Sequence, residues 1–161
     1  MYSIKGQVAY KVEPVTFFDL DMKEKDIEEI LRLNIDMLCG DEESMLIVGQ
    51  QVKNEKYSRS DLTAIDNDGS IVLIEVKRDR KDIEGRKEAF EFQAIRYAAS
   101  YATIGSPNEL VEKVYAPYIE RYRHEFEPGE LTSFEFGVRK LYEFLRENKA
   151  EKSFNKQQRI I

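Results

Sequence analysis

The sequence of 161 residues contains a single cysteine, Cys39, and a single histidine, His124. One cysteine excludes a disulfide framework within the chain and a cysteine zinc site, and it favours a reducing, cytoplasmic setting. A single histidine argues against histidine-rich metal sites, and its place in a charged segment argues against a Ser-His-Asp triad. Any acid–base or metal chemistry in this chain therefore has to come from carboxylates and lysine.

Long apolar runs are also missing from the chain. No run approaches the ~20 residues that a membrane span needs, and the first residues lack the basic-then-apolar pattern of a signal peptide. The 42% hydrophobic fraction, with nine tyrosines and nine phenylalanines, predicts one folded domain over residues 1–161. The net charge of −6 does not indicate a nonspecific nucleic-acid binder. We therefore expect a folded cytoplasmic protein without a membrane span.

Two apolar segments joined by Asn67-Asp68-Gly69 carry the most informative pattern. The first opens on Asp61, and the second ends on Glu75 and Lys77. Because an unpaired buried charge costs several kcal/mol, ionisable groups at the ends of apolar strands indicate a site. A divalent metal ion and a phosphodiester would explain all three residues together. Chance is the competing explanation, since 35% of the residues are charged.

The geometry of this hairpin depends on its loop. A three-residue loop pairs Asp66 with Ser70 and places Asp61 directly opposite Glu75, where two carboxylates can share one ion. A five-residue loop keeps this register, whereas a two-residue loop sends Asp61 to the other face unless a bulge intervenes. Gly69 suits the left-handed position that ends a three-residue loop, which favours the first alternative.

Periodicity and capping patterns predict the other elements. Residues 2–19 read as an extended lead-in, and a capping box of Asp21 and Glu24 predicts a helix that ends at Cys39. The further elements that we expect are strands at 45–53, 61–66 and 70–77, a helix from 83 or 86 to 104, a helix from 107 to 122 after a cap at Ser106, a helix from Thr132 to Asn148, and the start of a strand at 158–161.

This order resembles the PD-(D/E)XK nuclease superfamily, the restriction-endonuclease-like α/β fold with an αβββαβ core. The chain looks nearest to the branch of archaeal and actinobacterial branched-DNA and mismatch endonucleases and to uncharacterised bacterial relatives. There the pattern R-x-D-L-x-A-I-D-x-D-G-x-(apolar)-E-x-K precedes a helix with Q-x-x-x-Y, here Gln93 and Tyr97. Ser60 replaces the leading proline. The resemblance covers a core at about 20–104; residues 106–150 look like a helical insertion, and 158–161 like the start of a further core strand.

The resemblance implies a central mixed sheet and a Mg²⁺-dependent DNA endonuclease, with Mn²⁺ as a substitute ion, in a defence or repair protein. Its implied metal ligands are Asp61, Glu75 and the backbone carbonyl of Val76, the first two of which also suit the oxygen preference of Mg²⁺. The implied catalytic residues are Asp61, Glu75, Lys77, Glu28 and Gln93. The implied nucleic-acid contacts are Tyr97 and Arg59. Arg78 and Lys81 are further candidates for phosphate contact because they lie in a basic cluster close to the predicted site, although such clusters are most often solvated faces.

The family pattern includes a catalytic glutamate on the first helix, and in this sequence Glu24, Glu28 and Glu29 are the candidates for it. We choose Glu28 because it borders the apolar stripe of that helix, whereas capping occupies Glu24 and Glu29 points outward.

Two other functions remain open. One is a nuclease-fold module that binds DNA without cutting it. The other is a protein-interaction domain that uses the aromatic residues of the helices at 107–148, which are Tyr115, Tyr118, Tyr122 and Phe134. Because the strand at 158–161 is short and leaves a sheet edge poorly covered, we also expect the chain to pair with a copy of itself or to have a frayed carboxyl terminus. We expect the natural protein to continue with further apolar residues and further domains.

Overall fold

The computed structural model describes residues 1–53, 59–78 and 90–161, without the side chains of residues 53, 59, 90–94 and 97. It is a mixed α/β structure with a four-stranded sheet in the order β3-β4-β5-β6. The strands are β3 (Met45–Lys53), β4 (Arg59–Asp66), β5 (Ile71–Ile74) and β6 (Gln158–Ile160). The first three pair antiparallel, and β6 lies parallel to β5, so the start of a strand expected at 158–161 is confirmed.

The hairpin of β4 and β5 has the register that a three-residue loop predicts. Leu62 pairs with Ile74, and the Asp66 amide donates to the Ser70 carbonyl at 3.1 Å. Gly69 has a φ of 82°, the left-handed conformation expected of it. The Asp66 carboxylate accepts hydrogen bonds from the amides of Asp68 and Ser70, which fixes the loop and therefore the register.

Strand β5 ends earlier than the sequence predicted, at Ile74 and not at residue 77. After Ile74, the Val76 amide donates to Asp61 Oδ2 at 2.8 Å, and the Glu75 amide donates to the Ile161 carbonyl at 3.0 Å. The carboxylate of Asp61 thus accepts the hydrogen bond that a backbone carbonyl of β4 would accept in a regular ladder. This substitution ends the strand and draws residues 75–77 toward Asp61.

The core lies between this sheet and the helices. Leu62, Ile65 and Val72 on the strands and Ile119 and Leu141 on the helices are fully buried. Burial of such a side chain stabilises the fold by about 1.5–3 kcal/mol relative to exposure. The hydrophobic runs in the sequence therefore fix the sheet on which the ionisable residues are mounted.

Helix α1 (Glu24–Leu33) is shorter than expected and is followed by a 3₁₀-helix, η1 (Ile35–Leu38). The expected cap at Asp21 is wrong: the helix is capped at Lys23, whose amide donates to Asp26 Oδ2 at 2.8 Å. Asn34 ends the helix because its side chain donates back to the Ile30 carbonyl at 2.9 Å.

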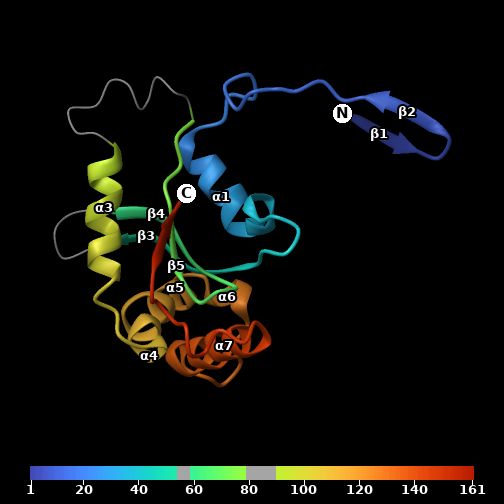
Figure 1. Cartoon of the computed structure of the whole chain (residues 1–161). Coiled ribbons are helices and arrows are strands. Elements are labelled where there is room, and N and C mark those ends of the chain that lie inside the picture. The colour runs from blue at the N-terminus through green and yellow to red at the C-terminus, as the bar shows by residue number, and fades with distance from the viewer. Residues whose placement is uncertain (54–58, 79–89) are drawn as a thin grey trace.

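The later helices pack together in one group, at one end of the sheet (Figure 1). They are α4 (Pro107–Leu110), a π-helical turn η2 (Val111–Tyr115), α5 (Ala116–Arg121), α6 (Arg123–Phe126) and α7 (Ser133–Glu147). The single helix expected at 107–122 is interrupted because Pro117 has no amide hydrogen to donate, and the π-turn absorbs this loss. The cap expected at Ser106 is confirmed, and Thr132, where the sequence predicts a helix to begin, caps α7.

Helix α3 (Phe90–Tyr101) packs on β5 and β6, and the start expected for it at 83 or 86 lies outside the described residues. Within the extended lead-in, β1 (Tyr2–Lys5) and β2 (Val8–Lys11) form an antiparallel hairpin that the sequence did not predict. This hairpin projects from the rest of the chain and is exposed along both strands (Figure 1). Across the part of the chain that the structure describes, no helix has the length and apolar character needed to cross a membrane.

Candidate active site

Four segments bring ionisable and amide side chains together beside the open end of the hairpin. Glu28 comes from α1, Gln51 from β3 and Asp61 from β4, while Glu75 and Lys77 follow β5. Their side chains are largely buried, with 8% of Lys77, 10% of Glu75 and 16% of Asp61 exposed, and Glu28 is 6% exposed. Charged groups at this depth need close partners, and each of them has one.

Lys77 lies close to the carboxylates of both Asp61 and Glu75. Its ammonium donates to Glu75 Oε1 at 2.8 Å and to the Val76 carbonyl at 2.7 Å, and it lies 3.8 Å from Asp61 Oδ2. The ammonium therefore neutralises a cluster of oxygen atoms that would otherwise repel one another.

Glu28 lies on the other side of Asp61, and a glutamine connects the two. Gln51 Nε2 donates to both carboxylate oxygens of Glu28, at 2.9 and 2.8 Å, and to Asp61 Oδ1 at 3.3 Å. Burial raises the pKa of the Glu28 carboxyl; the hydrogen bonds from Gln51 oppose this shift, and the nearby Asp61 carboxylate adds to it. Of the three glutamates considered on the first helix, Glu28 is the one that reaches this group.

Gln51 is the site residue that sequence reasoning missed. It lies within β3 at a φ of 53°, in the left-handed region, just after a register shift between Ile47 and Gly49. A strand that alternates regularly gives no reason to expect this backbone. The one indication in the sequence was the polar pair Gln50-Gln51 inside an otherwise apolar strand.

Of the remaining predicted site side chains, the structure describes that of Arg78. The guanidinium of Arg78 lies 5.8 Å from the centre of the Phe18 ring, on the lead-in. Lys81 and the side chains of Arg59, Gln93 and Tyr97 lie outside the described residues. Their proposed roles stay predictions.

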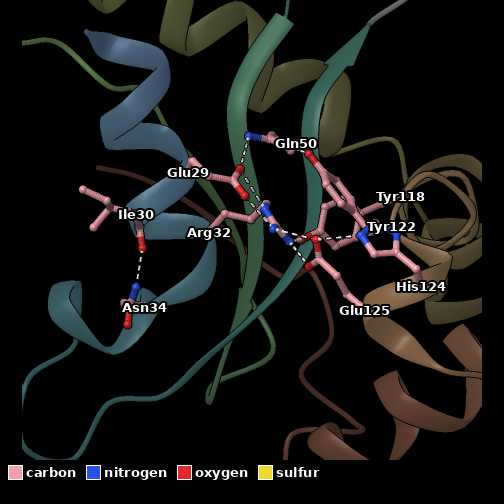
Figure 2. A network of polar contacts seen from close by, with 9 residues as sticks. All are labelled: Glu29, Ile30, Arg32, Asn34, Gln50, Tyr118, Tyr122, His124 and Glu125. Carbon is pink, nitrogen blue, oxygen red and sulfur yellow. Dashed lines mark hydrogen bonds and ion pairs between the residues drawn. The ribbon is translucent and has the colours of Figure 1, made fainter. Parts of the chain in front are cut away.

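A second polar cluster adjoins the site through α1 and β3 (Figure 2). The Arg32 guanidinium, whose side chain is 4% exposed, donates twice to Glu29, twice to Glu125 and once to the Tyr118 hydroxyl. It also lies 4.1 Å from the centre of the Tyr122 ring. Glu29 therefore does not point outward as expected; it holds Arg32, which joins α1 to α5 and α6.

The adjacent glutamines of β3, Gln50 and Gln51, contact different clusters. The hydroxyl of Tyr122 donates to Gln50 Oε1, and Gln50 Nε2 lies 3.5 Å from Glu29 Oε2. Gln50 thus points to the Arg32 cluster, whereas Gln51 points to Glu28 and Asp61. The later helices are in this way connected to the backbone that carries the site.

The oxygen atoms of the site suit a hard divalent cation in their chemistry. Carboxylate and carbonyl oxygens are the ligands that Mg²⁺ prefers, and Asp61, Glu75 and the Val76 carbonyl present them around one ammonium. Among the described residues, no three carboxylate, histidine or cysteine side chains converge closely enough to hold an ion in their present positions. The N–H groups of Lys77 and Gln51 lie between the carboxylates and contact the oxygen atoms that an ion would contact. The oxygen atoms of Asp61, Glu75 and Val76 therefore suit a cation once the Lys77 ammonium moves aside.

Comparisons with models of protein families, with curated proteins and with solved structures gave no match to this chain.

Proposed function

We propose that the chain is a metal-dependent DNA endonuclease with a restriction-endonuclease-like core. The observation that carries the proposal is the convergence of Asp61, Glu75 and Lys77 around one point at the end of the hairpin. The described elements of the core follow the order helix, three strands, helix, strand, which agrees with the αβββαβ order of that fold. DNA would be the partner and Mg²⁺ or Mn²⁺ the cofactor.

Hydrolysis of a phosphodiester requires a positioned water and neutralisation of the charge that builds on the phosphate oxygens. Asp61, Glu75 and the Val76 carbonyl would hold the cation, which supplies Lewis-acid stabilisation of that charge and makes water more acidic. Lys77 has a compact ammonium on a flexible stem, so it can leave the Val76 carbonyl and still donate to a water or to a phosphate oxygen beside Glu75.

The alternative of a protein-interaction domain has weaker support. Tyr115 and Tyr118, two of the aromatic residues on which that alternative depends, are buried at 1% and 5% exposure. Their rings pack on each other and on Phe126, so they belong to the interior of the helical group. Pairing with a second copy of the chain stays a prediction.

Cleavage of labelled DNA tests the proposal. Single-stranded, duplex, mismatched and branched substrates are incubated with Mg²⁺, with Mn²⁺ and with chelator, using the wild type and the variants Asp61→Asn and Lys77→Met. We expect metal-dependent cleavage by the wild type and a loss of at least ~100-fold in each variant, since a group that positions or transfers a proton is worth about that much or more.

Lys140→Met is the matched control, because Lys140 also pairs with a glutamate, Glu143 at 3.1 Å, but on the exposed face of α7. It should cleave at the wild-type rate. Absence of cleavage on every substrate, or equal rates for the wild type and Lys77→Met, would contradict the proposal.

A further inference from the structure

The two oxygen atoms of Asp61 belong to two different surroundings. Oδ2 accepts the Val76 amide and lies near the Lys77 ammonium, on the side of Glu75. Oδ1 faces the Gln51 amide, on the side of Glu28. Asp61 therefore stands between two places where negative oxygen atoms gather, which is the arrangement in which one carboxylate can bridge two cations.

The place between Asp61 and Glu28 is filled by an amide group. Gln51 Nε2 lies 2.8–3.3 Å from three carboxylate oxygens. Both neighbours are acceptors, so the nitrogen of the amide faces them and its oxygen does not. A second cation between Glu28 and Asp61 would have to occupy the position of this nitrogen.

The backbone holds Gln51 in that position at a cost. A side-chain-bearing residue in the left-handed region is disfavoured by roughly 1–2 kcal/mol. The flanking residues are fixed by their pairing, Gln50 with Leu62 and Val52 with Ser60, so the strained residue cannot relax without breaking the β3–β4 ladder. Strain that the surrounding structure maintains in this way is common at functional sites.

The two nitrogen groups of the site differ in how readily they can leave. Lys77 carries its ammonium on a flexible four-carbon side chain, so the ammonium can move away from the Val76 carbonyl when a cation binds. Gln51 is held by its strained backbone and by three contacts. The place beside Lys77 can thus open to a cation, whereas the place beside Gln51 stays filled.

We propose that Gln51 restricts this site to one divalent cation by filling the position between Glu28 and Asp61. The inference rests on the proposed function, because it assumes that Asp61 and Glu75 bind a cation. Gln51 is a positioning residue: it holds the Glu28 and Asp61 carboxylates in place and excludes the second ion.

The number of bound ions is measured directly by titrating the purified chain with Mn²⁺ alone and following free Mn²⁺ by electron paramagnetic resonance. The wild type should bind one ion per chain. Gln51→Gly removes the amide and suits the left-handed backbone, and Gln51→Asn keeps that backbone with a shorter side chain, so each should bind two.

Two further variants identify where the second ion lies. Adding Glu28→Gln to Gln51→Gly should return the count to one, because it removes a carboxylate of the second position. Gln50→Ala changes the neighbouring glutamine, which faces the Arg32 cluster, and should leave the count at one. Thermal melting of each variant confirms that it is folded.

The outcomes separate the two proposals. A folded wild type that binds no Mn²⁺ overturns the metal site and this inference together. A wild type that binds two ions, or folded Gln51→Gly and Gln51→Asn that bind one, overturns this inference and leaves the proposed nuclease function standing.

Discussion

Replacement of Arg32 by methionine should destabilise the chain and loosen the later helices from the sheet. Methionine keeps an unbranched apolar side chain but removes all five hydrogen bonds to Glu29, Glu125 and Tyr118. Removing one partner from a fully buried ion pair costs about 3–5 kcal/mol. The carboxylates left behind are partly exposed, Glu29 at 45% and Glu125 at 35%, so water can solvate them in part.

We therefore expect the free energy of unfolding of Arg32→Met to be lower than that of the wild type by about 2–3 kcal/mol, less than the cost for fully buried pairs. For a chain of this length, the melting temperature should fall by roughly 4–12 °C. Urea unfolding and thermal melting at pH 7 measure both quantities. Arg121→Met is the matched control, because Arg121 stacks 5.2 Å from the centre of the same Tyr122 ring but is exposed, and it should change stability by less than about 0.5 kcal/mol.

The penalty should also depend on pH. The hydrogen bonds from Arg32 lower the pKa of the Glu29 carboxyl, so this pair contributes stability above the ordinary pKa of a glutamate and loses it as the pH falls through the lowered value. The difference between the wild type and Arg32→Met should therefore shrink below about pH 4. Equal melting temperatures for the two proteins at pH 7, or a difference that grows on acidification, would refute this reasoning.

Three more predictions follow from single residues. Burial raises the pKa of Glu28 and disfavours its ionised form, so Glu28→Gln should be more stable than the wild type at pH 7; the gap should close as the pH falls from the raised pKa to the ordinary glutamate value, and urea unfolding at pH 7 and pH 4 measures this. Alkylation of Cys39 at pH 8, followed by mass spectrometry, should be slower in the folded chain than in urea, because burial raises the pKa of its thiol. Gly69→Ala should lower the stability of the fold, followed by thermal melting, by at least about 1–2 kcal/mol, because φ is 82° and the new methyl group would meet the Ala150 carbonyl oxygen at 3.1 Å. The control Gly105→Ala has room for the methyl group and should lower stability less. An acid-sensitive gap of the opposite sign, equal alkylation rates, or equal losses at the two glycines would each contradict the corresponding argument.

The parts of the structure that follow from local chemistry could be predicted from the sequence. The register of β4 and β5 depends on three loop residues, so Asn67-Asp68-Gly69 favoured the pairing of Asp66 with Ser70 that the structure shows, and with it the pairing of Leu62 with Ile74. The cap at Thr132 likewise involves residues three apart in the chain. In these cases the interacting groups are close in sequence and the geometry has few alternatives.

The parts that depend on distant contacts could not be predicted. Arg32 and Glu125 are 93 residues apart, and nothing in either segment indicates the other. Gln51 has a left-handed backbone inside the paired strand β3, beyond a register shift that exists only in the pairing of β3 with β4. Strand β5 stops at Ile74 because a side chain of another strand takes the place of a backbone partner. Each of these features is a tertiary interaction that overrides a regular local pattern.

The position of a bound cation tests the proposed site most directly. Crystals of the wild-type chain soaked in Mn²⁺ would give an anomalous difference peak at the ion. We predict a single peak within coordination distance, about 2.1–2.2 Å, of oxygen atoms of Asp61, Glu75 and Val76, with the Lys77 ammonium withdrawn from the Val76 carbonyl. A peak bound only elsewhere on the chain, or none at this site at an Mn²⁺ concentration that supports cleavage, would contradict the proposed metal centre.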